Sequence, residues 1–424
     1  MARVVFHSMA HRGDVYPYVP IASELSRRGH DVAYVVPREF HDTFRAEPFR
    51  SVHSGTDFGP EALDQHGAYL ARWGMRLGGA LVLRLYFGQF TIPHLDALFD
   101  AVDAEVAGAD LVFPHPAASM VSAMSCERRG VPWIVGDLFP MLLRNDEDPP
   151  MPGLPNLGPS VNRRLWGLSS SPRLDRISSA DGFKAYRRRL GLPVPEGWNI
   201  IDARLSPHRN LGLAPAAYVP VKQGWPSNYE LTGFSNWSGP DDGRLPADVS
   251  EFLDAGSPPV IVTLGTSGAS ARPELFEQAA AALDAEGARG LFLVSTAENV
   301  TRLRSAGLGP AHGAWPFVPL APLLPRSRGI VHSGAHGTNA LALAAGVPSV
   351  VIPCLFDQLW HARRQAELGT GVWVRRPRRL GAALRRLLSD ASLRDAAEAL
   401  APAIQAADGT AIAADRIEAF LRSM

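Results

Sequence analysis

A segment in the second half of the chain has the composition of an anion-binding turn. It runs from His332 to Thr338 (His-Ser-Gly-Ala-His-Gly-Thr), after a β-branched run that ends at Val331 and before an apolar stretch that predicts a helix over residues 339–345. Backbone N–H groups at a helix start lack intrahelical acceptors, and the positive end of the helix dipole attracts anions as well. We expect a diphosphate here, bound by His332, Gly334, Ala335, His336, Gly337 and Thr338.

The sizes of the free-energy contributions indicate which of these groups matter most for anion binding. The helix dipole contributes ~0.3–1 kcal/mol in exposed settings, whereas each hydrogen bond to a charged group contributes ~1.5–3 kcal/mol. Most of the affinity should therefore come from the backbone amides together with Thr338 and His332. A second glycine turn, residues 263–267, offers further N–H and hydroxyl groups from Gly265, Thr266 and Ser267. These hydroxyls could equally be ordinary loop groups.

Two aspartates have positions that suggest either a structural or a chemical role. Asp14 follows the first apolar run, so it could act as a general base, with His11 as the nearest rival. It could also cap a helix that begins with Tyr16 and Pro17. Asp357 precedes a helix that is expected to begin near Gln358, where aspartate is a favoured N-cap.

Short apolar runs alternate with longer amphipathic stretches in both halves of the chain. Unbroken apolar strands separated by helices predict parallel sheets that are covered on both faces. The expected fold class is therefore α/β, with two doubly wound domains and with ligands bound beyond the carboxyl ends of the strands. The expected strands are 4–6, 32–36, 111–113, 133–135, 260–264, 291–295, 329–332 and 349–352.

A linker rich in Gly, Pro, Ser and Asp, residues 233–259, divides the chain. It predicts a domain boundary near residue 235, between residues 1–234 and residues 235–400, with one short helix around residues 247–255. A proline-rich, irregular stretch over residues 145–172 is a candidate lid or acceptor loop.

Composition excludes several classes of function. The 424 residues contain 42 Lys plus Arg and 42 Asp plus Glu, so no net field draws the chain to nucleic acid. The two cysteines, Cys126 and Cys354, have no metal-ligand spacing and predict neither a disulfide framework nor a zinc site. No signal peptide is expected, and the apolar run 77–90 falls short of the ~20 residues of a membrane helix. We expect a cytoplasmic protein without a spanning segment.

With these motifs in place, the sequence resembles the inverting GT-B glycosyltransferases that use nucleotide sugars, in the sterol and glycopeptide-antibiotic branch. The resemblance runs nearly end to end and is concentrated in four segments. These are His332–Thr338, PCLFDQ at residues 353–358, Phe317-Val318-Pro319, and the RGDVYP element at residues 12–17. Two departures are His336, where many relatives have Gly or Asn, and Ala340, where plant relatives have a ribose-binding Glu.

The resemblance implies roles for these residues. Two Rossmann-like domains would face each other across a cleft, an N-terminal acceptor-binding domain over residues 1–234 and a nucleotide-sugar donor-binding domain over residues 235–400. Residues 401–424 would form a helix that packs back across the cleft. Asp14 would be the catalytic base, Asp357 and Gln358 would bind the donor sugar, and Phe317 and Val318 would contact the base of the nucleotide. Trp315 is an alternative residue for stacking on the nucleotide base, but aromatic residues in such a segment often belong to the core.

The implied activity is inverting, metal-independent transfer of a hexose from a UDP- or TDP-sugar to a hydroxyl of a hydrophobic natural product or sterol-like molecule, as in antibiotic biosynthesis. No cofactor is expected, and no Asp-x-Asp metal motif occurs in the donor half. Acceptor, sugar, base and oligomeric state stay open. The alternatives are a nucleotide-sugar epimerase of the same fold and a non-catalytic nucleotide-sugar-binding protein.

Overall fold

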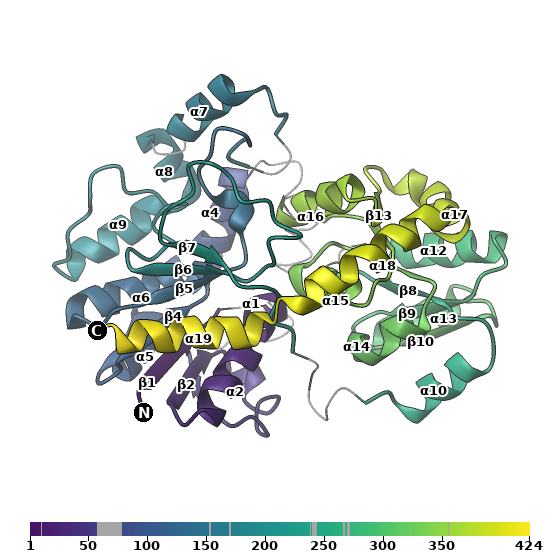
Figure 1. Cartoon of the computed structure of the whole chain (residues 1–424), viewed down its shortest axis with the longest axis horizontal. Helices are drawn as coiled ribbons and strands as arrows, with labels where there is room; N and C mark the ends of the chain where they lie inside the picture. Colours follow the sequence, from purple (N-terminus) through teal and green to yellow (C-terminus); the bar gives the residue numbers. More distant parts are fainter. Residues whose placement is uncertain are drawn as a thin grey trace. The chain divides into compact units, whose positions relative to one another are not determined.

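The computed structural model describes residues 1–9, 11–56, 79–151, 154–168, 171–237, 239, 244–265, 268, 272–354 and 356–424. Within these ranges the chain forms two compact units. The first contains residues 1–56, 79–237 and 407–424, and the second contains residues 239–406 (Figure 1). The division after Trp237 lies inside the predicted linker.

The first unit contains parallel strands throughout. Its four-stranded sheet has the order β3-β2-β1-β4, and a three-stranded sheet has the order β5-β6-β7, with a single bridge from Val112 to Trp133 between the two. The strands are β1 (Arg3–His7), β2 (Asp31–Val36), β3 (Arg50–His53), β4 (Leu111–Pro114), β5 (Ile134–Asp137), β6 (Arg209–Gly212) and β7 (Tyr229–Leu231).

Helices cover both faces of the first sheet because successive side chains of each strand point to opposite sides. Val4 and Phe6 pack with α2 and α19, whereas Val5 packs with α5 and α6. The helices are α1 (Arg12–Val15), α2 (Val19–Arg27), α4 (Gly79–Phe90), α5 (Leu95–Val106), α6 (Pro116–Arg129), α7 (Pro159–Leu168), α8 (Pro172–Ser178), α9 (Ala180–Arg189) and α19 (Gly409–Arg422).

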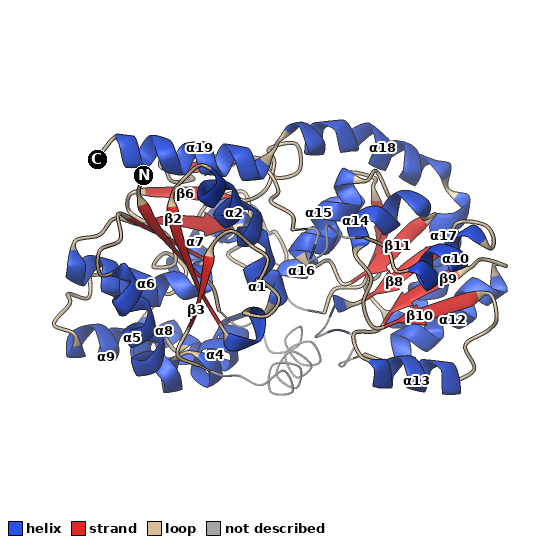
Figure 2. Ribbon diagram, turned by 90° about the horizontal axis from the view of Figure 1, so that it is seen from below, coloured by secondary structure: helices blue, strands red, loops and turns tan. Residues whose placement is uncertain are grey.

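The second unit is built around one six-stranded parallel sheet with the order β10-β9-β8-β11-β12-β13. Its strands are β8 (Val260–Thr263), β9 (Gly290–Leu293), β10 (His312–Trp315), β11 (Gly329–His332), β12 (Ser349–Val351) and β13 (Gly371–Trp373). Figure 2 shows the strands of each unit in red among blue helices.

Two separate hydrophobic cores again lie on opposite faces of this sheet. Val260 and Val262 pack with α12 and α17, whereas Ile261 packs with α10 and α15. The helices are α10 (Ala247–Asp254), α12 (Glu274–Ala285), α13 (Ala297–Ser305), α14 (Leu320–Leu323), α15 (His336–Ala344), α16 (Phe356–Glu367), α17 (Leu380–Ser389) and α18 (Ala391–Ala406). The prediction of doubly wound α/β units is confirmed.

Two predicted segments differ in detail. The proline-rich stretch over residues 145–172 is not irregular throughout, because α7 occupies residues 159–168. Near the C-terminus, α18 ends at Ala406 and α19 begins at Gly409, where the Asp408 side chain caps it by accepting from Ala411 N at 3.0 Å. Helix α19 belongs to the first unit, where His30 lies 3.1 Å from Glu418.

Among the described residues, none of the helices has the length and hydropathy needed to cross a lipid bilayer.

Candidate functional site

The turn between β11 and α15 has the geometry of an anion site. Gly334 has φ +89°, and a Cβ there would come within 2.9 Å of Val351, so the turn requires glycine. Helix α15 begins at His336, and its N-cap residue Ala335 makes no side-chain cap bond. The first intrahelical bond runs from Asn339 N to Ala335 O at 2.9 Å. The amides of the first turn of α15 are therefore the groups that this turn offers to an anion.

His332 shapes this turn from inside the protein. Its side chain is buried, and Nδ1 accepts a hydrogen bond from Gly334 N at 3.0 Å. Burial lowers the pKa of His332 to about 3, so the ring is neutral at pH 7 and brings no positive charge to a phosphate. His336 is also buried, with its ring centroid 6.0 Å from that of His361. His332 therefore supports the turn from inside the protein, and its expected direct contact with the diphosphate stays a prediction.

The glycine turn after β8 lies on the same sheet edge, because β8 and β11 are neighbours in the sheet. Gly265 has φ +68°, and its N–H donates to Thr263 Oγ1 at 3.4 Å. The other two residues predicted at this turn, Thr266 and Ser267, lie outside the described residues. Their role in diphosphate binding stays a prediction.

Asp357 and Gln358 lie in the first turn of α16. The helix begins at Phe356, so the prediction that Asp357 is the N-cap is wrong. The Asp357 carboxylate accepts from its own N–H and from that of Gln358, while burial raises its pKa to about 6. Gln358 Oε1 accepts from Cys354 N at 2.8 Å and so closes the loop between β12 and α16.

The segment after β10 presents one exposed aromatic ring. Phe317 is 57% exposed, whereas Val318 is buried and can offer only its backbone. Trp315 is committed to the fold, since its Nε1 donates to Asp248 at 2.7 Å and its ring packs edge-on against Phe252. Of the two rival platforms for a nucleotide base, Phe317 is the available one.

In the first unit, Asp14 lies within a cluster of polar side chains. It is inside α1, whose N-cap is His11, so Asp14 does not cap a helix that begins at Tyr16. Its side chain is 18% exposed, with Oδ1 at 3.5 Å from His115 Nε2 and Oδ2 accepting from the Tyr86 hydroxyl at 3.4 Å.

The protonation state of each neighbour of Asp14 follows from that neighbour's own contacts. His115 is the N-cap of α6, where its Nδ1 accepts from Ala117 N at 3.1 Å. The proton of the neutral ring is therefore on Nε2, which points at Asp14. Burial, with Asp14 nearby, raises the pKa of Tyr86 well above 10, so its hydroxyl stays protonated. Both neighbours can donate to the Asp14 carboxylate.

Sequence reasoning missed His115, although a signal was present. His115 directly follows β4, which pairs with β1, and the register places Pro114 opposite His7. Residues just beyond the carboxyl ends of adjacent parallel strands must lie close together. His11, the rival base, lies beside the same cluster, with its ring centroid 6.5 Å from that of Tyr86.

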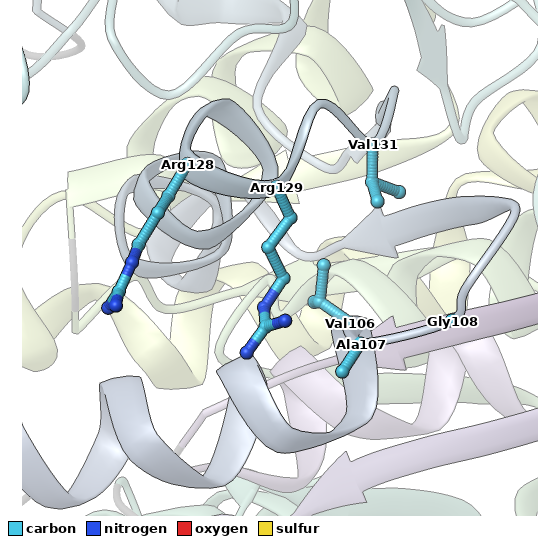
Figure 3. Close-up of a pocket in the computed structure, with 6 residues that line it drawn as sticks. All are labelled: Val106, Ala107, Gly108, Arg128, Arg129 and Val131. Atoms are coloured by element: carbon cyan, nitrogen blue, oxygen red, sulfur yellow. The ribbon is translucent and has the colours of Figure 1, made fainter.

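A hollow elsewhere in the first unit does not belong to this site. Its volume is about 370 Å³, and Figure 3 shows the six residues that line it, Val106, Ala107, Gly108, Arg128, Arg129 and Val131. It lies where α5 and α6 end and where the chain enters β4 and β5. This is the amino edge of the sheet, whereas Asp14 and His115 lie at the carboxyl edge.

Across the described ranges, no three or more His, Cys, Asp or Glu side chains are grouped so as to hold a metal ion. The residues brought together are instead neutral histidines, backbone amides and single carboxylates.

Several known proteins resemble this chain over most of its length. The family described as "Erythromycin biosynthesis protein CIII-like, C-terminal domain" matches residues 294–419. The 4'-demethylrebeccamycin synthase of Lentzea aerocolonigenes is 30% identical over 98% of this chain and 99% of its own. The O-mycaminosyltylonolide 6-deoxyallosyltransferase of Streptomyces fradiae is 27% identical over 98% and 94%.

A solved structure, that of the glycosyltransferase VinC in complex with dTDP, shares the fold. Its TM-score is 0.69 at 21% identity, over 99% of this chain and 100% of that one. Fold and relatives agree. The chain belongs to the GT-B glycosyltransferases of natural-product and antibiotic biosynthesis.

Proposed function

We propose that this glycosyltransferase moves a sugar from a dTDP- or UDP-sugar to a hydroxyl of a hydrophobic small molecule, with inversion and without a metal ion. The observation that carries the proposal is the turn between β11 and α15. There the required glycine and the uncapped helix start present backbone amides where a diphosphate can bind. The dTDP complex of VinC favours dTDP over UDP as the carrier.

On the donor side, each loop at the carboxyl edge of the second sheet binds a different part of the nucleotide sugar. The diphosphate binds at the start of α15, Phe317 stacks on the base, and Asp357 accepts from hydroxyls of the sugar. Strand β10 is three strands from β11, and at ~4.8 Å per strand the two loops are roughly 14 Å apart along the edge. A nucleotide extended along this edge would reach both loops.

The reaction is a single displacement. The acceptor hydroxyl attacks the anomeric carbon, its proton passes to the Asp14 carboxylate, and the bond from the anomeric carbon to the diphosphate oxygen breaks. Negative charge grows on the leaving diphosphate, where fixed backbone amides stabilise it without reorganisation. His115 and Tyr86 hold the two carboxylate oxygens of Asp14 in place during the transfer.

The acceptor is proposed to be apolar and to bind the first unit. Residues 79–90 of the apolar run 77–90 form helix α4, but the side chains at 79–83 and 90 lie outside the described part of the chain. The support therefore comes from another stretch. Among the described residues between 154 and 177, the first unit exposes four large hydrophobic side chains, Leu154, Leu157, Leu168 and Ile177. Contiguous exposed apolar side chains are typical of a surface that binds an apolar ligand, and we propose that these four contribute to one.

A transfer assay tests the whole proposal. Purified enzyme is incubated with dTDP-glucose or UDP-glucose and a panel of sterols, polyketides and peptides, with and without EDTA. The product is analysed by mass spectrometry and its anomeric configuration by NMR. We expect an inverted glycoside of an apolar acceptor, unaffected by EDTA. Retained configuration or loss of activity in EDTA would overturn the mechanism, and epimerised donor without transfer would indicate an epimerase.

A further inference from the structure

A buried polar network lies behind the turn between β11 and α15. Gln365, on α16, is only 1% exposed, and its side-chain amide lies between three polar groups. The Gln365 amide nitrogen is 3.5 Å from His332 Nε2 and 2.6 Å from Asn339 Oδ1, and the Thr370 hydroxyl is 3.5 Å from Gln365 Oε1. The network thus joins the end of β11, helix α15 and helix α16.

The contacts of His332 decide which end of the Gln365 amide must face it. Nδ1 accepts from Gly334 N, so Nδ1 carries no proton. The buried neutral ring therefore carries its proton on Nε2, and this N–H points at Gln365. An amide nitrogen facing this N–H would set two donors against each other, whereas an amide oxygen would accept from it. The hydrogen-bond network assigns the two ends of an amide.

We propose that Gln365 is a positioning residue for the diphosphate turn, and that its amide oxygen accepts from His332 Nε2–H and fixes the ring form in which Nδ1 holds Gly334 N. Asn339 turns with it and donates to the same oxygen, and the Gln365 nitrogen donates to the Thr370 hydroxyl. That hydroxyl in turn donates to the Gln365 backbone carbonyl at 3.3 Å. Each contact in the network then pairs a donor with an acceptor.

The functional consequence is specific to the turn, and it rests on the proposed diphosphate site. Without an acceptor at residue 365, the buried Nε2–H of His332 has no partner, and an unpaired buried donor is destabilising. The ring then turns toward another acceptor, and the hydrogen bond from Gly334 N to Nδ1 that closes the turn is lost. The amides of α15 lose their fixed orientation, so binding of dTDP weakens by about 5- to 30-fold.

A double-mutant cycle with dTDP as ligand tests the proposal. In Gln365→Leu the dissociation constant, measured by calorimetry, should rise by the factor given above. In His332→Asn the side-chain oxygen can replace Nδ1 as the acceptor for Gly334 N without any Nε2–H, so adding Gln365→Leu should change little further. Leu283→Ala, a core change on α12 beside Gly290 of β9, is the control: melting temperature falls while dTDP affinity is retained.

A ligand-free measurement separates this inference from the proposed function. In ¹⁵N-histidine NMR spectra, His332, assigned by its loss in His332→Asn, should be protonated at Nε2 in the wild type. In Gln365→Leu the ring should stay neutral, but its Nε2 and Nδ1 resonances should shift or broaden because both hydrogen bonds are lost. An Nδ1-protonated ring in the wild type, or additive effects in the cycle, would overturn the inference. Wild-type protein with the expected spectrum but without dTDP binding would refute the diphosphate site and leave the hydrogen-bond assignment intact.

Discussion

Replacement of Asp14 by asparagine tests the proposed base with little change in shape. Asparagine keeps an oxygen that can face His115 Nε2, its amide nitrogen can donate to the Tyr86 hydroxyl, and Asp14 is not a helix cap, so the fold loses little. What disappears is the capacity to take a proton. General-base catalysis is typically worth ~10²–10⁴-fold, so kcat should fall at least about a hundredfold, which corresponds to ~2.7 kcal/mol in the activation barrier.

The assay combines steady-state transfer kinetics with two binding and stability measurements. The dTDP affinity and the melting temperature of Asp14→Asn should stay close to the wild type, because the diphosphate site belongs to the second unit. Asp42→Asn, which neutralises an exposed aspartate of the same unit, should retain full activity. If Asp14→Asn keeps near-normal kcat while His11→Ala loses it, the base is His11 and the reasoning about Asp14 is refuted.

Three further changes test other parts of the site. His115→Asn keeps an N-cap acceptor for α6 but removes the Nε2–H donor, so kcat should fall about 5- to 30-fold while the melting temperature stays unchanged. An unchanged kcat would contradict a role for the contact with Asp14. Phe317→Ala should weaken dTDP binding by ~1–3 kcal/mol in calorimetry, whereas a loss below this range would exclude stacking. Asp357 has a pKa raised to about 6, so its carboxylate is protonated at lower pH and affinity for the sugar donor should rise as pH rises through about 6. Asp357→Asn should abolish this pH dependence, and a pH dependence that persists in the variant would show that another group causes it.

The sequence predicted the buried strands well because each is a short run of apolar residues between helices. The strands it missed, β3, β6, β7, β10 and β13, contain polar residues or glycine, as in RNLG and HGAW. Four of these five lie at sheet edges, where one side of the strand has no neighbour and the apolar pattern weakens. Edge strands depend on tertiary pairing more than on their own composition.

The residues of the candidate site were easier to predict than their states. Motif and spacing indicated Asp14, His332 and Asp357, but burial and hydrogen bonding decide what each can do, and these come from distant segments. Asp357 is the clearest example, since its pKa of about 6 follows from burial that no local pattern reveals. The role of Gln365 could not be predicted from the sequence either, because a glutamine within an amphipathic helix gives no sign that it faces a histidine of β11.

The two units use histidine in the same way, and this bears on the choice of base. In each unit a buried histidine follows or ends a strand and accepts a backbone N–H at Nδ1, from Ala117 for His115 and from Gly334 for His332. Such a ring must carry its proton on Nε2, so neither nitrogen has a lone pair to offer a substrate hydroxyl. His115 and His332 can therefore position other groups but cannot act as bases in this form. Between the two candidates left, the carboxylate of Asp14 accepts from the Tyr86 hydroxyl at 3.4 Å and lies 3.5 Å from His115 Nε2, and these two neighbours restrict its orientation as a proton acceptor in a single displacement needs.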